Sequence, residues 1–373
     1  MAIAGPRSYG HSMEQANGKL LGHQNLIARL AAKGAGGYIA CALTVSICMH
    51  QLLVIVALQL YFDLRPPTRA KLKGSEKMKQ PEVDTEKFWH DGYLIVKNMF
   101  SPAEITRMRE DVFASLSGRE KNGEPVLDAL ADPHLQHWVH DERLISVAKK
   151  LLGADNLAYY GDGGYAVVGH GYTPGKDVGG WHRDNTDRSD VSAPDWESRY
   201  SLVRFGMYLQ DHSRTSGGLI VRRDSHNRVL RGWKAHLHDR YLNTGIGEVG
   251  VWSMRIQHAG LGRCIRGFPG LPLGPYLQKK LPEFMQAPFP KLERTGFWIS
   301  YGLDDAHLSR HCDYLMGRSE RLEMWTHARY SQEILDHCTA AGLKVIDMPA
   351  RMRQAIAAGD TPGKHKHHYQ MPF

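Results

Sequence analysis

The chain has 373 residues, of which 42% are hydrophobic and 23% charged, so it is neither a mainly disordered nor a fibrous protein; one or two globular domains are expected. A net charge of +8 would permit a nucleic-acid partner, but the sequence contains no nucleic-acid-binding motif. We therefore expect no nucleic-acid partner. Five cysteines without CxxC spacing favour a reducing compartment over a zinc knuckle or a disulfide framework: Cys41, Cys48, Cys264, Cys312 and Cys338.

The stretch from Tyr38 to Phe62 contains no Asp, Glu, Lys or Arg and is long enough for one membrane span. Polar residues such as His50 and Gln59 interrupt it, and the alternatives are a late signal sequence or a start site placed too far upstream. More lysines and arginines follow the stretch than precede it, which predicts a single-pass protein with its large C-terminal part in the cytoplasm. We expect a disordered tail at 1–37, a transmembrane helix at 38–62 and a basic linker at 63–82.

A catalytic domain is expected at 83–359, before a polar, histidine-rich tail at 360–373 that is interpreted as a frayed terminus and not a metal site. Tyr93 to Val96 is a candidate strand. Ser101 is an expected N-cap, because Pro102 occupies the first helical position and Glu104 stands three residues after the cap. This pattern predicts a helix that ends near Leu116.

The rest of the domain is predicted to be mainly β-structure with flanking helices. Between Tyr200 and Leu209 apolar residues alternate with Arg204 and Tyr208, which is typical of a half-buried strand. Helical spacing returns from Glu320 to Ala341. Many short strands without regular intervening helices favour a sandwich or barrel. Further strands are expected at Leu219–Val221, Val249–Ile256 and Gly296–Tyr301.

The segment GGWHRDNTD, Gly179 to Asp187, places His182 and Asp184 two residues apart. In an extended segment residues i and i+2 point to the same side, so both side chains can reach one cation. A mononuclear Fe(II) oxygenase needs two histidines and one carboxylate, with open positions for a cosubstrate and O2. Polar loops also contain His and Asp, so a second histidine is required.

His258 is the candidate for that second histidine, because it ends the strand-like run VGVWSMRIQHAG before Ala259 and Gly260. Such a rim position suits a ligand. His226 ends the stretch SGGLIVRRDSHN and is interpreted instead as a turn histidine that hydrogen-bonds its own loop.

Four separated segments resemble the phytanoyl-CoA dioxygenase superfamily of Fe(II)- and 2-oxoglutarate-dependent oxygenases. They are FWHDGYLIVKNMFSPAEITRMRED, GWHRDNTD, MYLQDHSRTSGGLIVRRDSH and IQHAG, in the order expected of that family. The resemblance implies a double-stranded β-helix, or jelly roll, with flanking helices. It also implies that His182, Asp184 and His258 are the catalytic iron ligands.

Two features depart from the family pattern. Arg223 and Asp224 stand where the family usually has Pro-Gly before Ser-His. The arginine expected to bind 2-oxoglutarate also lies farther from the distal histidine than usual. We favour Arg294, because RTGFWISYG reads as a strand that can present a guanidinium fork to a carboxylate. Arg263 and Arg266 are the fallback candidates, in a segment rich in Gly and Pro.

The implied reaction is oxidative decarboxylation of 2-oxoglutarate to succinate and CO2, coupled to hydroxylation of a small-molecule substrate. The predicted membrane segment suggests a lipid-like substrate. Two alternatives are a cupin-like metal-dependent isomerase or hydrolase that does not use 2-oxoglutarate, and a catalytically silent, membrane-tethered binding domain. In the latter, His182, Asp184 and His258 would not converge.

An insertion at 261–290 is too long and too rich in proline for a plain turn. It is interpreted either as a lid over an apolar substrate entrance or as an insertion packed on the outside. The apolar residues that would form the lid are Phe268, Leu271, Leu273 and Tyr276.

Overall fold

The computed structural model describes residues 81–117, 128–169, 180–260, 262–273, 281–290 and 293–363. The predicted span at 38–62, the tail at 1–37, most of the linker, Tyr276 and residues 364–373 lie outside these ranges. Among the residues described, no helix combines the length and the apolar character that crossing a membrane requires.

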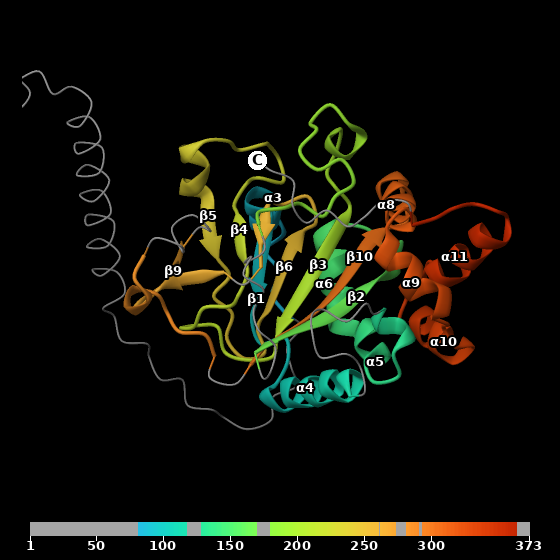
Figure 1. The fold of residues 1–373 in the computed structure, drawn as a ribbon, viewed down its shortest axis with the longest axis horizontal. Helices are drawn as coiled ribbons and strands as arrows, with labels where there is room; N and C mark the ends of the chain where they lie inside the picture. The colour runs from blue at the N-terminus through green and yellow to red at the C-terminus, as the bar shows by residue number, and fades with distance from the viewer. Residues whose placement is uncertain are drawn as a thin grey trace, which may run out of the picture. The chain divides into compact units, whose positions relative to one another are not determined.

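A six-stranded sheet forms the larger part of the fold (Figure 1). Its strand order is β1-β6-β3-β10-β2-β11, and every pairing is antiparallel except that of β11 with β2. The strands are β1 (Tyr93–Val96), β2 (Leu157–Gly169), β3 (Leu202–Tyr208), β6 (Val249–Ser253), β10 (Glu293–Leu303) and β11 (Lys344–Val345).

A three-stranded sheet of order β5-β4-β7 packs against the larger one through a shared apolar cluster that includes Tyr208, Val221 and Trp252. Its strands are β4 (Ile220–Arg222), β5 (Asp239–Tyr241) and β7 (His258–Ala259). The run predicted as one strand to Ile256 therefore ends at Ser253. It then turns, since Ile256 N donates to Ser253 O, and His258 enters the smaller sheet.

Helices cover the other face of the large sheet, where they form the main core with the strands (Figure 1). The helix α4 (Pro102–Leu116) begins with the predicted capping box of Ser101 and Glu104. The C-terminal helices form a second core around Trp325. The other helices are α3 (Thr85–Asp91), α5 (Gln136–Val139), α6 (Glu142–Leu152), α8 (Ala306–Met316), α9 (Ser319–His327), α10 (Gln332–Ala340) and α11 (Met348–Ala357).

These helices make the fold a mixed sheet-and-helix architecture, with more helix than the sequence led us to expect. The predicted C-terminal helical stretch is divided, because Ser331 caps α10 and Ala328 already has extended backbone. The strand β3 is buried on both faces and not half-buried, since helices cover one side and the smaller sheet the other.

The described part of the insertion is not an irregular loop. It contains a hairpin of β8 (Arg263–Ile265) and β9 (Phe268–Leu273), in which Leu273 is buried and Phe268 and Leu271 are half-buried. The three cysteines described, Cys264, Cys312 and Cys338, are buried and not disulfide-bonded.

Candidate metal centre

The predicted residues His182, Asp184 and His258 lie together between the two sheets. One ligand atom from each is within 4.8 Å of the others. The Nε2 atoms of His182 and His258 lie 3.8 Å and 3.4 Å from carboxylate oxygens of Asp184. The convergence that a silent binding domain would lack is therefore present.

The main chain holds the two histidines side by side. His182 N donates to His258 O, and His258 N donates to His182 O, both at 2.9 Å. These two bonds form an isolated antiparallel bridge that brings the ring centroids within 4.2 Å. Asp184 N is bonded to Met254 O at 3.0 Å, so the carboxylate residue is tied to the same turn.

Hydrogen bonds also fix which ring nitrogen of each histidine faces the centre. His182 Nδ1 lies 2.9 Å from Gly180 O, and His258 Nδ1 lies 3.1 Å from Ile256 O. A carbonyl only accepts, so each Nδ1 carries the proton and each Nε2 presents a lone pair. Burial and the nearby His182 lower the pKa of His258 to about 3, which keeps its ring neutral at physiological pH.

The sequence did not reveal the partner of Asp184. Arg204, on β3, donates from Nη1 to Asp184 Oδ2 at 2.7 Å and from Nη2 to the buried Asp162 at 2.6 Å. Burial alone would raise the pKa of Asp184, but Arg204 and the two histidines together hold it well below its ordinary value. Asp184 is thus a carboxylate, with Oδ2 occupied by Arg204.

The same network extends to α9, where Arg321 Nη2 donates to Asp162 Oδ1 at 2.8 Å. Arg204 also donates from Nε to Ser300, on the neighbouring strand β10, at 2.9 Å. The alternation in β3 places Arg204 opposite the apolar face of the strand. In a half-buried strand that face is expected to be exposed, so the sequence offered no sign that Arg204 is buried beside the cluster.

Arg294 lies at the start of β10. Its Nε donates to Gly217 O at 2.5 Å, and its guanidinium lies over the Tyr208 ring, 5.3 Å from the centroid. Among the residues described, no carboxylate is paired with it. The fallback candidates are engaged elsewhere, since Arg263 and Arg266 both donate to Gln286.

His226 is separate from this cluster and bonds to Trp89 O through Nε2 at 2.9 Å. It is a turn histidine, as predicted, although its partner belongs to α3 and not to its own loop. Asp224, where the family usually has glycine, has a left-handed backbone with φ of 64°. Aspartate is one of the few residues other than glycine that adopt this conformation without severe strain.

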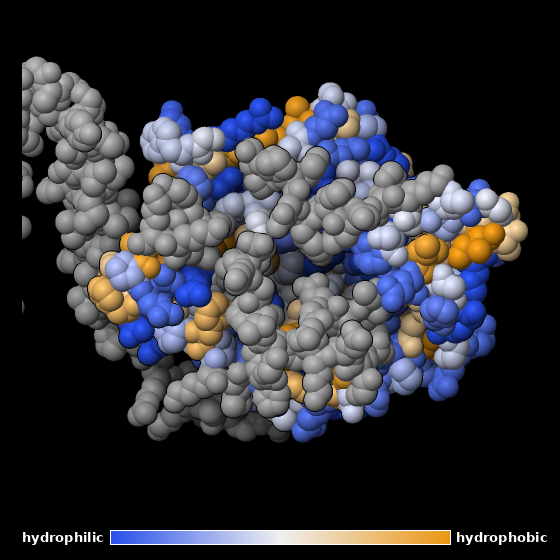
Figure 2. Space-filling model, in the orientation of Figure 1, coloured by the Kyte–Doolittle hydropathy of each residue, from blue (hydrophilic) through white to orange (hydrophobic). Residues whose placement is uncertain are grey.

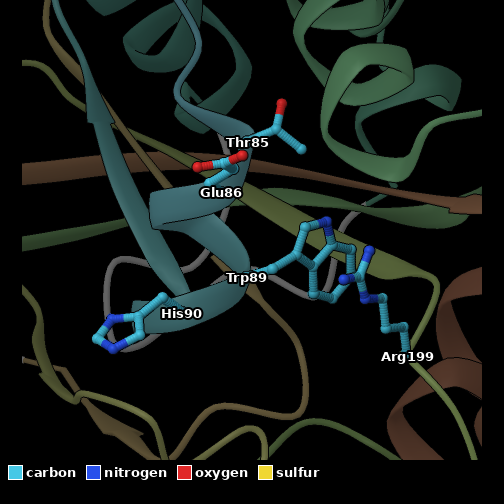
Figure 3. A pocket seen from close by; sticks show the side chains of 5 residues that line it. All are labelled: Thr85, Glu86, Trp89, His90 and Arg199. Carbon is cyan, nitrogen blue, oxygen red and sulfur yellow. The ribbon is translucent and has the colours of Figure 1, made fainter.

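A surface pocket of about 340 Å³ lies elsewhere, lined by α3 and the loop residue Arg199 (Figure 3). Its lining is Thr85, Glu86, Trp89, His90 and Arg199, and includes none of the three converging residues. The Arg199 guanidinium faces the Trp89 ring at 5.2 Å. A cation needs convergent donors, which this pocket does not provide.

His182, Asp184 and His258 form a cluster that could hold a metal ion, and two histidines with one carboxylate are the donor set of mononuclear non-heme iron oxygenases. The sequence model of the phytanoyl-CoA dioxygenase family matches residues 88–249, so this part of the chain is similar to that family. The match includes His182 and Asp184 and ends before His258. The donor set fits the Fe(II) and 2-oxoglutarate site of such oxygenases. No curated protein matches the chain.

Several solved structures are distantly similar to this chain. The non-heme monooxygenase ThoJ in complex with nickel has 16% identity, a TM-score of 0.38 and coverage of 59% of this chain and 76% of its own. HygX from Streptomyces hygroscopicus, with nickel and 2-oxoglutarate bound, has 14% identity, a TM-score of 0.41 and coverages of 60% and 88%. The α-ketoglutarate-dependent epimerase SnoN has 15% identity, a TM-score of 0.39 and coverages of 58% and 80%. These values are too low to assign a reaction.

Proposed function

We propose that the protein is an Fe(II)- and 2-oxoglutarate-dependent dioxygenase that hydroxylates a small molecule and releases succinate and CO2. The convergence of the side chains of His182, Asp184 and His258 within 4.8 Å of one another is the observation that supports this most strongly. The two sheets that enclose the cluster support a double-stranded β-helix core at 83–359.

In this proposal His182 and His258 hold the metal through Nε2, and Asp184 holds it through Oδ1, because Arg204 occupies Oδ2. Bound Fe(II), with 2-oxoglutarate and O2, supplies the oxidising chemistry for a C–H bond. Arg294 binds the distal carboxylate of 2-oxoglutarate, since its fork is fixed by Gly217 and Tyr208 and has no carboxylate partner among the described residues. The side chains of the three residues are at most 18% exposed, which limits the access of water to the centre.

A lipid-like substrate is the class we favour. The support is the predicted membrane segment at 38–62, which would place the domain beside a bilayer, with the domain on the cytoplasmic side. The metal-dependent isomerase or hydrolase remains the second candidate, because the same three ligands serve both. The two reactions differ in their need for 2-oxoglutarate.

The test is succinate formation from 2-oxoglutarate by the full-length protein, with Fe(II) and ascorbate. We expect succinate from the wild type, none from His182→Ala, and undiminished succinate from His90→Ala, whose side chain is 76% exposed. If wild-type protein forms no succinate, anaerobic binding of 2-oxoglutarate to the iron-loaded protein is measured. Binding would indicate a missing prime substrate, whereas retained iron without binding would favour the isomerase or hydrolase.

A further inference from the structure

The 3-10 helix η3 (Trp233–His238) presents two large apolar side chains to solvent. Trp233 is 71% exposed and Leu237 is 61% exposed, while Ala235 between them is buried. A 3-10 helix has three residues per turn, so Ala235 and His238 share one side and the remaining four residues point outward. The buried side fixes the turn and leaves Trp233 and Leu237 projecting.

Cations surround this apolar tip. Arg228, Arg231 and Lys234 are exposed, and Arg240 is half-buried. The two nearby acidic residues are already engaged: Asp224 pairs with Arg228, and the buried Asp239 pairs with Arg222. Within the described residues Arg231, Lys234 and Arg240 have no carboxylate within ion-pairing distance, so the surface carries an uncompensated positive charge.

We propose that this surface, Arg228 to Arg240, docks on an anionic lipid bilayer. Tryptophan is favoured at the interface between headgroups and acyl chains, and leucine can insert below it. Lysine and arginine beside them attract lipid phosphates and carboxylates. A projecting tip of two apolar residues is far smaller than the roughly 800 Å² that each partner buries in a standard protein interface. A bilayer, which accepts a small convex tip, fits better.

The smaller sheet connects this surface to the metal centre. The edge strand β5 directly follows η3 and pairs with β4, whose other edge pairs with β7, where Val221 lies opposite His258 (Figure 1). Docking at η3 would therefore hold the sheet that carries His258 against the bilayer. On the face seen in Figure 2, apolar colour occurs in separate patches among hydrophilic residues. Trp233 and Leu237 are two of the seven large hydrophobic residues that are exposed in the described part of the chain.

The experiment must separate this contact from any membrane insertion of 38–62. Full-length protein is added to vesicles of phosphatidylcholine alone or with phosphatidylserine, each prepared with and without brominated acyl chains. The fluorescence emission of Trp233 is obtained by subtracting the emission of Trp233→Phe from that of the wild type. We expect bromine to quench this difference emission in the phosphatidylserine vesicles only, and the quenching to be lost in Arg231→Glu/Lys234→Glu. The double variant Val191→Ala/Lys344→Glu, at exposed positions outside this surface, should keep it.

Equal quenching with and without phosphatidylserine, or no quenching in either, would overturn the proposal. So would a Trp233 emission that shifts with protein concentration in the absence of vesicles, which would indicate contact with a second copy of the chain. Neither readout depends on catalytic activity, so docking and the proposed oxygenase reaction can fail separately.

Discussion

Arg204 and Asp184 are joined by a hydrogen bond of 2.7 Å between Nη1 and Oδ2, at the point where the large sheet meets the metal centre. The guanidinium is held from its other side by the buried Asp162. Arg204 therefore acts as a positioning residue: it fixes the rotamer of Asp184 and leaves Oδ1 for a cation. Residues that hydrogen-bond to a metal ligand commonly change metal affinity by about 10- to 100-fold.

Replacement of this partner should weaken metal binding without removing a ligand. In Arg204→Met we expect the affinity for Fe(II), or for Ni(II) as a stable substitute, to fall about 10- to 100-fold. Arg204→Lys keeps the charge but not the planar fork, so an intermediate affinity is expected. Metal titration monitored by calorimetry measures both, after circular dichroism has shown that each variant is folded. Unchanged affinity in Arg204→Met would contradict the positioning role.

Arg294 can be tested through its effect on the cosubstrate alone. Charged hydrogen bonds are worth about 1.5–3 kcal/mol, so Arg294→Leu should raise the KM for 2-oxoglutarate by roughly 10- to 100-fold. Metal affinity should stay the same, since Arg294 does not contact the three converging residues. Arg263→Leu is the matched control, because Arg263 bonds to Gln286. A larger effect in the control would reassign the role to Arg263.

Gly247 is required by both its backbone and its surroundings. Its φ is 79°, and an added Cβ would lie 2.0 Å from the carbonyl oxygen of Phe100. Gly267 has nearly the same φ, 80°, but an added Cβ would have nothing within 4 Å. Gly267→Ala should therefore lower the free energy of unfolding by only about 1–2 kcal/mol, the cost of placing alanine in a left-handed backbone conformation. Gly247→Ala should lower the free energy of unfolding by more than that, because the backbone at Phe100 must also move away from the new Cβ. Urea unfolding compares the two, and equal losses would rule out the clash.

His226 should make stability depend on pH in a defined direction. Burial lowers its pKa to about 4, and its Nε2 donates to Trp89 O. The unfolded chain binds a proton near pH 6.5 and the folded chain does not, so the free energy of unfolding falls as the pH drops below that value. Because of His226, the free energy of unfolding should be about 2 kcal/mol lower at pH 5 than at pH 7.5.

His226→Gln should remove that part of the slope. The variant loses some stability at pH 7.5, because its bond to Trp89 is weakened, but the difference from wild type should shrink or reverse at pH 5. Guanidinium unfolding at both pH values measures this. The same wild-type-to-variant difference at both pH values would mean that folding does not lower the pKa of His226.

The sequence alone was sufficient where neighbours in the chain determine the structure. The capping box of Ser101 and Glu104, the strand at Tyr93–Val96 and the His-x-Asp pair are local patterns, and the structure contains each of them. His258 was a candidate because it ends a strand-like run, and the family resemblance supported it. It lies 74 residues after Asp184 in the numbering, and the His182–His258 bridge brings the two segments together.

Tertiary structure decided what depends on contacts between distant segments. Periodicity shows that Arg204 opposes the apolar face of its strand, but only packing reveals that this second face is also buried and that Asp162, Asp184 and Ser300 surround the guanidinium. The crossing of the chain between sheets after Ser253 and the hairpin within the insertion likewise arise from pairings between strands. Burial converts a charged strand residue into a fixed partner, because a buried cation needs carboxylates that only the folded chain brings to it.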